Sequence, residues 1–133
     1  MSTTLLAVLL FLGVLGAPDV VTGTQYTAYD GPVPHWTTAS GVECRRGTAA
    51  SYRGVYPFGT QGYLKCKTWS QFIRFDDTGK GFDDGRTWID AYRPDGNRQA
   101  ALANSMQRCE FYPLEAGWRV EWTVKGIALK RRD

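Results

Sequence analysis

Short stretches rich in β-branched and aromatic residues, each followed by a turn sequence, recur along most of this chain and predict short strands. They lie at residues 24–29, 62–67, 70–75, 87–92 and 118–126. The last of them shows the strictest alternation of apolar and polar residues. One helix is predicted at about residues 98–107, capped by Asp95 or Asn97. Because 133 residues leave no space for a second layer of helices, we expect one mainly β domain, a small closed barrel.

The most apolar run is LLAVLLFLGVLGA at residues 5–17. As a helix it would span about 20 Å, short of the roughly 30 Å hydrocarbon core of a membrane. It therefore favours an export signal, although no Lys or Arg precedes Leu5. We expect residues 1–23 to be a signal peptide or an N-terminal hydrophobic segment, cut after Ala17 or after Gly23, and residues 24–133 to be the domain. A buried helix or strand of the domain itself is the alternative.

This segment also sets the expected location. An exported chain would be secreted, periplasmic or in the cell wall, and it would be tethered to the membrane if residues 1–23 were retained. The net charge of +3 is too small and too scattered to indicate nucleic acid as a partner.

The three cysteines, Cys44, Cys66 and Cys109, lack the paired C-x-x-C spacing of zinc and thiol redox sites. In an exported chain they would form one disulfide and leave one free thiol, with all three pairings open. In the cytosol they would be three buried thiols. The aspartates of residues 76–84 lack the regular spacing of a calcium loop, so we expect neither a metal nor a cofactor.

Four motifs in fixed order resemble the 3D domain, which is named for three aspartates. They are YTAY (26–29), TASG (38–41), YPFGT (56–60), and DTG followed by IDAY (77–79 and 89–92). The resemblance covers about residues 25–124. It implies a six-stranded double-psi β-barrel with one short helix, similar to the catalytic barrel of the MltA-type lytic transglycosylases. Those enzymes cut peptidoglycan between N-acetylmuramic acid and N-acetylglucosamine and leave a 1,6-anhydro sugar.

Two of the family's aspartates have counterparts here. The resemblance implies Asp90 as the catalytic acid and base and Asp77 as a second catalytic charge, whereas Tyr52 stands at the position of the first aspartate. Asp76 could replace Asp77 if the register slips. In a strand, Asp90 shares one face with Trp88 and Tyr92, whose rings could shield the carboxyl and stack on sugars. The expected substrate contacts are Trp88, Tyr92, Thr38, Ser40, Gly41, Thr78 and Gly79.

A glycosidic oxygen needs a donor that is still protonated near neutral pH, and an apolar surrounding or a second carboxylate keeps a carboxyl protonated. The first hypothesis, which the resemblance implies, is a monomeric lytic transglycosylase that acts on glycan strands without a cofactor. The alternatives are a non-catalytic, expansin-like module that binds polysaccharide and a structural component of an envelope or virion. The replacement of the first aspartate by Tyr52 favours the binding module, and retention of residues 1–23 in the mature protein would favour the structural component.

Overall fold

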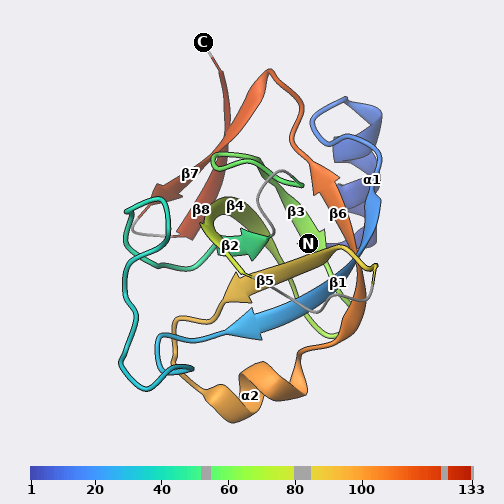
Figure 1. Ribbon diagram of the computed structural model, residues 1–133. Coiled ribbons are helices and arrows are strands. Elements are labelled where there is room, and N and C mark those ends of the chain that lie inside the picture. Colours follow the sequence, from blue (N-terminus) through green and yellow to red (C-terminus); the bar gives the residue numbers. More distant parts are fainter. Residues whose placement is uncertain (52–54, 80–84, 124–125, 133) are drawn as a thin grey trace.

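The computed structural model describes residues 1–51, 55–79, 85–123 and 126–132, and six of its strands form a closed barrel (Figure 1). These strands are β1 (Asp19–Tyr26), β2 (Thr48–Ser51), β3 (Gln61–Lys65), β4 (Ser70–Thr78), β5 (Trp88–Tyr92) and β6 (Gln107–Pro113). Their order around the barrel is β1-β5-β2-β4-β3-β6. The prediction of a mainly β, six-stranded barrel is confirmed.

The barrel is mixed. The pairs β1/β5 and β2/β4 are parallel, and the other four neighbouring pairs are antiparallel. Parallel neighbours cannot be joined by a tight hairpin, so the chain must cross from one strand to the next. The connection from β1 to β2, residues 27–47, is correspondingly long. It passes over the same end of the barrel at which β4 ends.

Four further elements lie outside the barrel: α1 (Thr3–Phe11), α2 (Arg98–Ala103), β7 (Trp118–Thr123) and β8 (Gly126–Arg131). β7 and β8 form a separate two-stranded sheet, so the strand predicted at residues 118–126 is not a barrel strand. The helix predicted at 98–107 ends at Ala103, because the chain from Gln107 onward pairs with β1 and β3 as β6. Asn97 is its cap, and its side chain accepts a hydrogen bond from the Ala100 amide.

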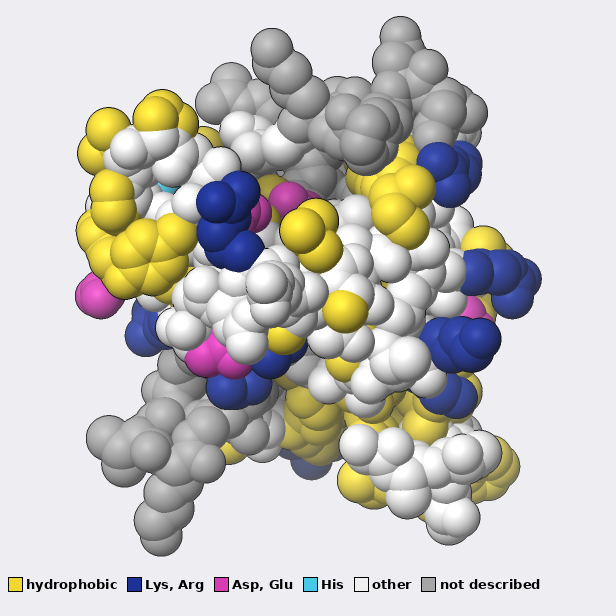
Figure 2. All heavy atoms as spheres, turned by 90° about the horizontal axis from the view of Figure 1, so that it is seen from below, with side chains coloured by type: hydrophobic (Ala, Val, Ile, Leu, Met, Phe, Trp, Pro, Cys, Tyr) yellow, Lys and Arg dark blue, Asp and Glu magenta, His cyan; other side chains and the backbone are white. Residues whose placement is uncertain are grey.

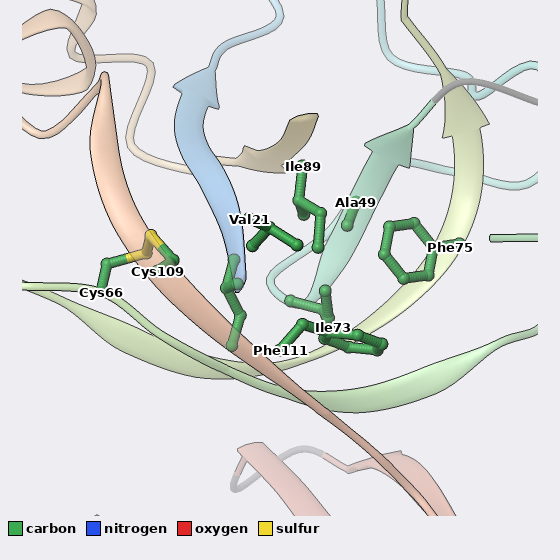
Figure 3. Packing of buried hydrophobic residues seen from close by; sticks show 9 residues of the cluster. Val21, Ala49, Cys66, Ile73, Phe75, Ile89, Cys109 and Phe111 are labelled. Atoms are coloured by element: carbon green, nitrogen blue, oxygen red, sulfur yellow. A yellow bond between two sulfur atoms is a disulfide. The ribbon is translucent and has the colours of Figure 1, made fainter. Parts of the chain in front are cut away.

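The barrel interior holds one tightly packed hydrophobic cluster (Figure 3). Its members are Val21, Ala49, Leu64, Cys66, Ile73, Phe75, Ile89, Cys109 and Phe111. Phe75 and Phe111 meet edge to face with their ring centroids 5.5 Å apart, and Tyr56 stacks on Phe75 at 4.8 Å. Each large side chain buried in this way contributes about 1.5–3 kcal/mol. The two central phenylalanines therefore fix the strands around them.

A disulfide joins Cys66 to Cys109, directly beyond the last paired residues of β3 and β6 (Figure 3). Of the three pairings left open by the sequence, this is the one present, and Cys44 carries a buried free thiol. The sulfurs lie against Gly23 of β1. A Cβ atom at residue 23 would come within 2.7 Å of the Cys66 sulfur and even closer to that of Cys109. Glycine is therefore required there by packing.

The N-terminal segment packs on the barrel. Leu6 and Leu15 are buried against Tyr63 and Tyr112, and α1 lies beside β6 (Figure 1). The other face of α1 leaves Phe11 89% exposed. In the described part of the chain, no helix has the length and apolar character needed to cross a membrane.

The boundary expected between residues 23 and 24 falls inside β1. β1 begins at Asp19, and its residues Val21 and Gly23 are buried in the barrel. A cut after Gly23 would remove more than half of this strand, whereas a cut after Ala17 would leave it whole. Gly23 resembles a signal-peptidase site because such a site needs a small residue. Here the small residue is needed because the two disulfide sulfurs pack against it.

A single methyl group added at Gly62 of β3 is expected to destabilise the barrel. The Cβ of an alanine would lie within 2.5 Å of the Phe111 ring and closer still to the Tyr112 carbonyl oxygen, and the paired backbone of β6 cannot move away. We expect Gly62→Ala to lower the free energy of unfolding by about 2 kcal/mol or more in urea titrations. Gly117→Ala is the control, because a Cβ there meets no atom within 4 Å. Equal effects of the two substitutions would contradict this packing argument.

Candidate functional site

A bulge in β4 determines which aspartate faces Asp90. Strand β2 lies between β4 and β5, and its Ala49 pairs with Phe75 on one side and Ala91 on the other. The next residue, Ala50, pairs with Asp77 and Asp90, so that β4 contains one extra residue at this point. Residues that pair across neighbouring strands point to the same face of a sheet. Asp77 and Asp90 therefore lie on one face, two strands apart, with about 10 Å between their backbones.

The extra residue is Asp76, which the sequence had left as an alternative to Asp77. It is only 6% exposed, and its carboxylate accepts a hydrogen bond of 2.7 Å from Nε of Arg74. This ion pair gives the buried Asp76 carboxylate a positively charged partner on its own strand. The register therefore selects Asp77 as the neighbour of Asp90.

Three donors orient the Asp77 carboxylate. The Tyr26 hydroxyl donates to Oδ2 at 3.0 Å, and the amides of Ala39 and Thr78 donate to Oδ1 at 2.9 Å. Burial and the charge of Asp77 both raise the pKa of Tyr26, so its hydroxyl keeps the proton that it donates. Asp77 thus connects β1, β4 and the connection between β1 and β2.

Asp90 lies in a drier environment on β5. Its Oδ1 accepts a hydrogen bond of 2.8 Å from Oγ1 of Thr24, the residue opposite it on β1. Burial is the main cause that raises the pKa of Asp90 to about 7; the hydrogen bond from Thr24 partly opposes this rise, and the charges of Asp30 and Asp77 add to it. A carboxyl with this pKa is protonated in a large fraction of molecules near neutral pH, as a proton donor to a glycosidic oxygen requires.

The raised pKa predicts how stability changes with pH. In the unfolded chain Asp90 should titrate near 3.9, and in the folded protein near 7, so the folded state holds the extra proton between these values. The free energy of unfolding should therefore fall as pH rises from about 4 to 7, by on the order of 2 kcal/mol after allowance for partial exposure. Urea titrations of the wild type and Asp90→Asn across this range should diverge with that sign. A constant difference between the two would contradict it.

Trp88 and Tyr92 share the face of Asp90, as predicted, but both rings pack inside the protein, with 4% and 5% of their surfaces exposed. Tyr92 contacts the ring of Tyr26, with the centroids 5.5 Å apart. The Arg86 guanidinium lies over the Trp88 ring at 4.7 Å. This burial argues against a sugar stacking directly on either ring. The two rings instead contribute to the apolar surroundings of β5.

The TASG motif forms a turn beside the end of β4. Thr38 is 5% exposed, and its hydroxyl bonds to the Ser40 hydroxyl and to the Val42 amide. The Ser40 amide donates to the Asp76 carbonyl at 3.1 Å, and Gly41 has a φ of 90°, which favours glycine. Ser40 and Gly41 are exposed. The motif therefore attaches the β1–β2 connection to the carboxylate-bearing strand.

A pocket of about 450 Å³ opens between this connection and the end of β4. Of the predicted site residues, Asp77, Thr38 and Thr78 line it. Asp90, Trp88, Tyr92, Ser40, Gly41 and Gly79 are not part of its lining; the Gly79 amide donates to the Ser51 carbonyl instead. The pocket thus contains one of the two predicted carboxylates.

Several pocket residues were missed in the sequence reasoning. They are Tyr26, Thr27, Asp30, His35, Thr37 and Cys44. Tyr26 belongs to the YTAY motif. Because Thr24 and Tyr26 are two residues apart on one strand, the sequence could have placed both side chains on the same face of β1. His35 and Thr37 gave no signal, because only the path of the β1–β2 connection brings them to the pocket.

Tyr52, at the position of the first family aspartate, and the acidic residues Asp83 and Asp84 lie outside the described residues. In the part of the chain that the structure describes, no three His, Cys, Asp or Glu side chains gather in a way that could hold a metal ion.

Comparison with known proteins gives no match: no family model matches the chain, and no curated protein matches it.

Proposed function

We propose that this protein cleaves the glycan strands of peptidoglycan as a lytic transglycosylase, with Asp90 as both acid and base. The observation that carries the proposal is the Asp90 carboxyl on β5, whose pKa of about 7 keeps it able to donate a proton near neutral pH. Asp77 supplies a second carboxylate on the same face, two strands away. The likeness to the 3D domain adds the substrate class.

The proposed reaction needs one carboxyl group. Protonated Asp90 donates its proton to the oxygen between N-acetylmuramic acid and N-acetylglucosamine, and the bond from that oxygen to the anomeric carbon breaks. The Asp90 carboxylate then takes the proton of the C6 hydroxyl of the muramic acid, whose oxygen bonds to the same anomeric carbon. The product is a 1,6-anhydro sugar, no water is consumed, and Asp90 ends protonated. Asp77 stabilises the positive charge that develops on the ring.

Two structural features support the setting of this reaction. The Cys66–Cys109 disulfide fits an oxidising compartment outside the cytoplasm, where peptidoglycan lies. The closed mixed barrel with two parallel pairs is compatible with the double-psi barrel of the 3D domain. We therefore propose an exported, monomeric protein, held at the membrane if α1 is retained.

The test is digestion of purified peptidoglycan, read by mass spectrometry. We expect soluble fragments that end in 1,6-anhydro-N-acetylmuramic acid, with a rate that falls as pH rises through about 7, because only protonated Asp90 can donate. A heat-denatured sample is the control for contaminating activity. Reducing ends, which require water, would indicate a hydrolase, and the absence of fragments would contradict cleavage.

A non-catalytic glycan-binding module is the second candidate. It is favoured by the position of Asp90 outside the pocket lining and by the burial of Trp88 and Tyr92. In the digestion experiment this alternative predicts that the protein sediments with insoluble peptidoglycan but releases no fragment.

A further inference from the structure

Two large aromatic side chains are exposed on the connection between β1 and β2. Tyr29 is 46% exposed and Trp36 is 50% exposed, and their rings meet edge to face with centroids 5.3 Å apart. Hydrophobic side chains gather at the left edge of the face shown in Figure 2, beside the histidine of the chain. A grouped exposure of this kind, bordered by polar residues, marks a contact surface.

The backbone around the two rings is fixed. The His35 amide donates to the Ala28 carbonyl at 2.7 Å and closes the loop between the rings, and the Cys44 amide donates to the Trp36 carbonyl at 2.8 Å. The Tyr29 ring packs on Gly96, where an added Cβ would come within 2.7 Å of it. The rings are thus held in place before any partner binds, which lowers the entropic cost of binding.

The same loop forms one wall of the pocket beside Asp77. The chain neighbours of the two rings line this pocket. They are Asp30, which follows Tyr29, and His35 and Thr37, which flank Trp36. Thr38 and Thr78 complete a lining that is rich in hydroxyl groups and carboxylates. The two rings therefore border a pocket of about 450 Å³ whose lining includes both apolar and hydrogen-bonding side chains.

We propose that Tyr29 and Trp36 form a carbohydrate-binding surface, on which one pyranose ring of a glycan strand stacks while a neighbouring sugar occupies the pocket. This inference rests on the proposed function, because it names the surface that would hold the substrate of that reaction. Trp36, which has the larger ring and the larger exposed fraction, is the main contact.

The chemistry of the two neighbouring surfaces favours a sugar. A pyranose has an apolar face of C–H groups, which packs on an aromatic ring, and a rim of hydroxyl groups, which need hydrogen-bond partners when water is removed. The rings supply the first requirement, and Asp30, Thr37 and Asp77 supply the second. This combination of exposed rings and neighbouring hydrogen-bonding groups distinguishes the surface from a purely apolar docking patch.

The test measures binding without cleavage, so every variant also carries Asp90→Asn. The probes are insoluble peptidoglycan in a sedimentation assay and a β-1,4-linked tetramer of N-acetylglucosamine in calorimetry. We expect Trp36→Ala to weaken binding of both probes at least tenfold, and Trp36→Phe to have an intermediate effect, because a smaller ring remains. Phe58→Ala is the matched control. Phe58 is another exposed aromatic residue, 42% exposed, outside the pocket lining, and its replacement should leave binding unchanged.

Each outcome decides the inference. Equal binding by the Trp36→Ala variant and its parent, or no binding of either probe by the parent, would overturn it. A change in oligomeric state on Trp36→Ala would also overturn it, since the rings would then join two copies of the chain. Ring-dependent binding without any release of anhydro fragments by the wild type would support the surface and reject the transglycosylase. A separate Trp36→Ala variant that retains Asp90 tests cleavage, and cleavage at the rate of the wild type would reject the surface and support the transglycosylase.

Discussion

Replacement of Asp90 by asparagine should abolish glycan cleavage while leaving the barrel folded. The amide cannot donate a proton to the glycosidic oxygen and cannot take one from the C6 hydroxyl, so we expect the rate to fall by about 10³-fold. The amide oxygen can still accept the hydrogen bond from Thr24. Because the substitution removes a buried charge, the variant should be at least as stable as the wild type above about pH 7. Release of anhydro fragments and urea titrations at pH 8 measure the two effects.

Asp19→Asn is the matched control. Asp19 is an exposed carboxylate at the start of β1, where it accepts a hydrogen bond from the Tyr56 hydroxyl. Its replacement should leave cleavage unchanged. Full activity of Asp90→Asn would reject Asp90 as the acid. Joint loss of activity and stability would indicate that this carboxyl serves the fold instead.

Loss of the Cys66–Cys109 disulfide should have the largest effect on stability. The bridge closes a loop across 43 positions, and the corresponding loss of entropy in the unfolded chain amounts to about 4 kcal/mol. We expect the double variant Cys66→Ala and Cys109→Ala to lose about this much free energy of unfolding, out of a total of roughly 5–15 kcal/mol for a small domain. Urea titrations under oxidising conditions measure the loss.

Two controls separate the bridge from simple packing. A reductant should destabilise the wild type and leave the double variant unchanged. Gly23→Ala should destabilise the wild type, because its Cβ meets both sulfurs, and should be tolerated once the sulfurs are gone. Insensitivity of the wild type to reductant would show that the bridge does not contribute to stability.

The strands that the sequence predicted correctly are those with bulky residues. Residues 62–67, 70–75 and 87–92 contain β-branched and aromatic side chains, and they correspond to β3, β4 and β5. β2 was missed because it consists of Thr, Ala, Ala and Ser. Those small residues are all buried between β4 and β5, a requirement of packing that local strand propensity does not report.

β6 and the hairpin were misread for different reasons. The good helix formers before Gln107 extended the predicted helix into β6, whereas the actual helix ends at Ala103. The alternation of residues 118–126 correctly predicted extended backbone, but a period of two is the same in a barrel strand and in a hairpin outside the barrel. The local pattern therefore predicted an extended backbone but not the strand with which it pairs.

The candidate site could be predicted only in part. That Asp90, Trp88 and Tyr92 share a face follows from strand geometry alone. The choice of Asp77 over Asp76 depends on a bulge between β2 and β4, and β2 had no sequence signal. The burial of Trp88 and the approach of His35 to the pocket depend on contacts between distant segments, which no local pattern contains.

The position of β1 has a consequence for the order in which the chain can fold. β1 lies near the N-terminus, yet it pairs with β5 and β6, where Thr22 meets Trp88 and Val21 meets Cys109. A chain leaving the ribosome cannot close the barrel until both late strands have emerged. Pairing between such distant segments is also slow. The barrel strands should therefore stay unpaired until β6 has been synthesised, so the early strands are exposed to other partners during that time.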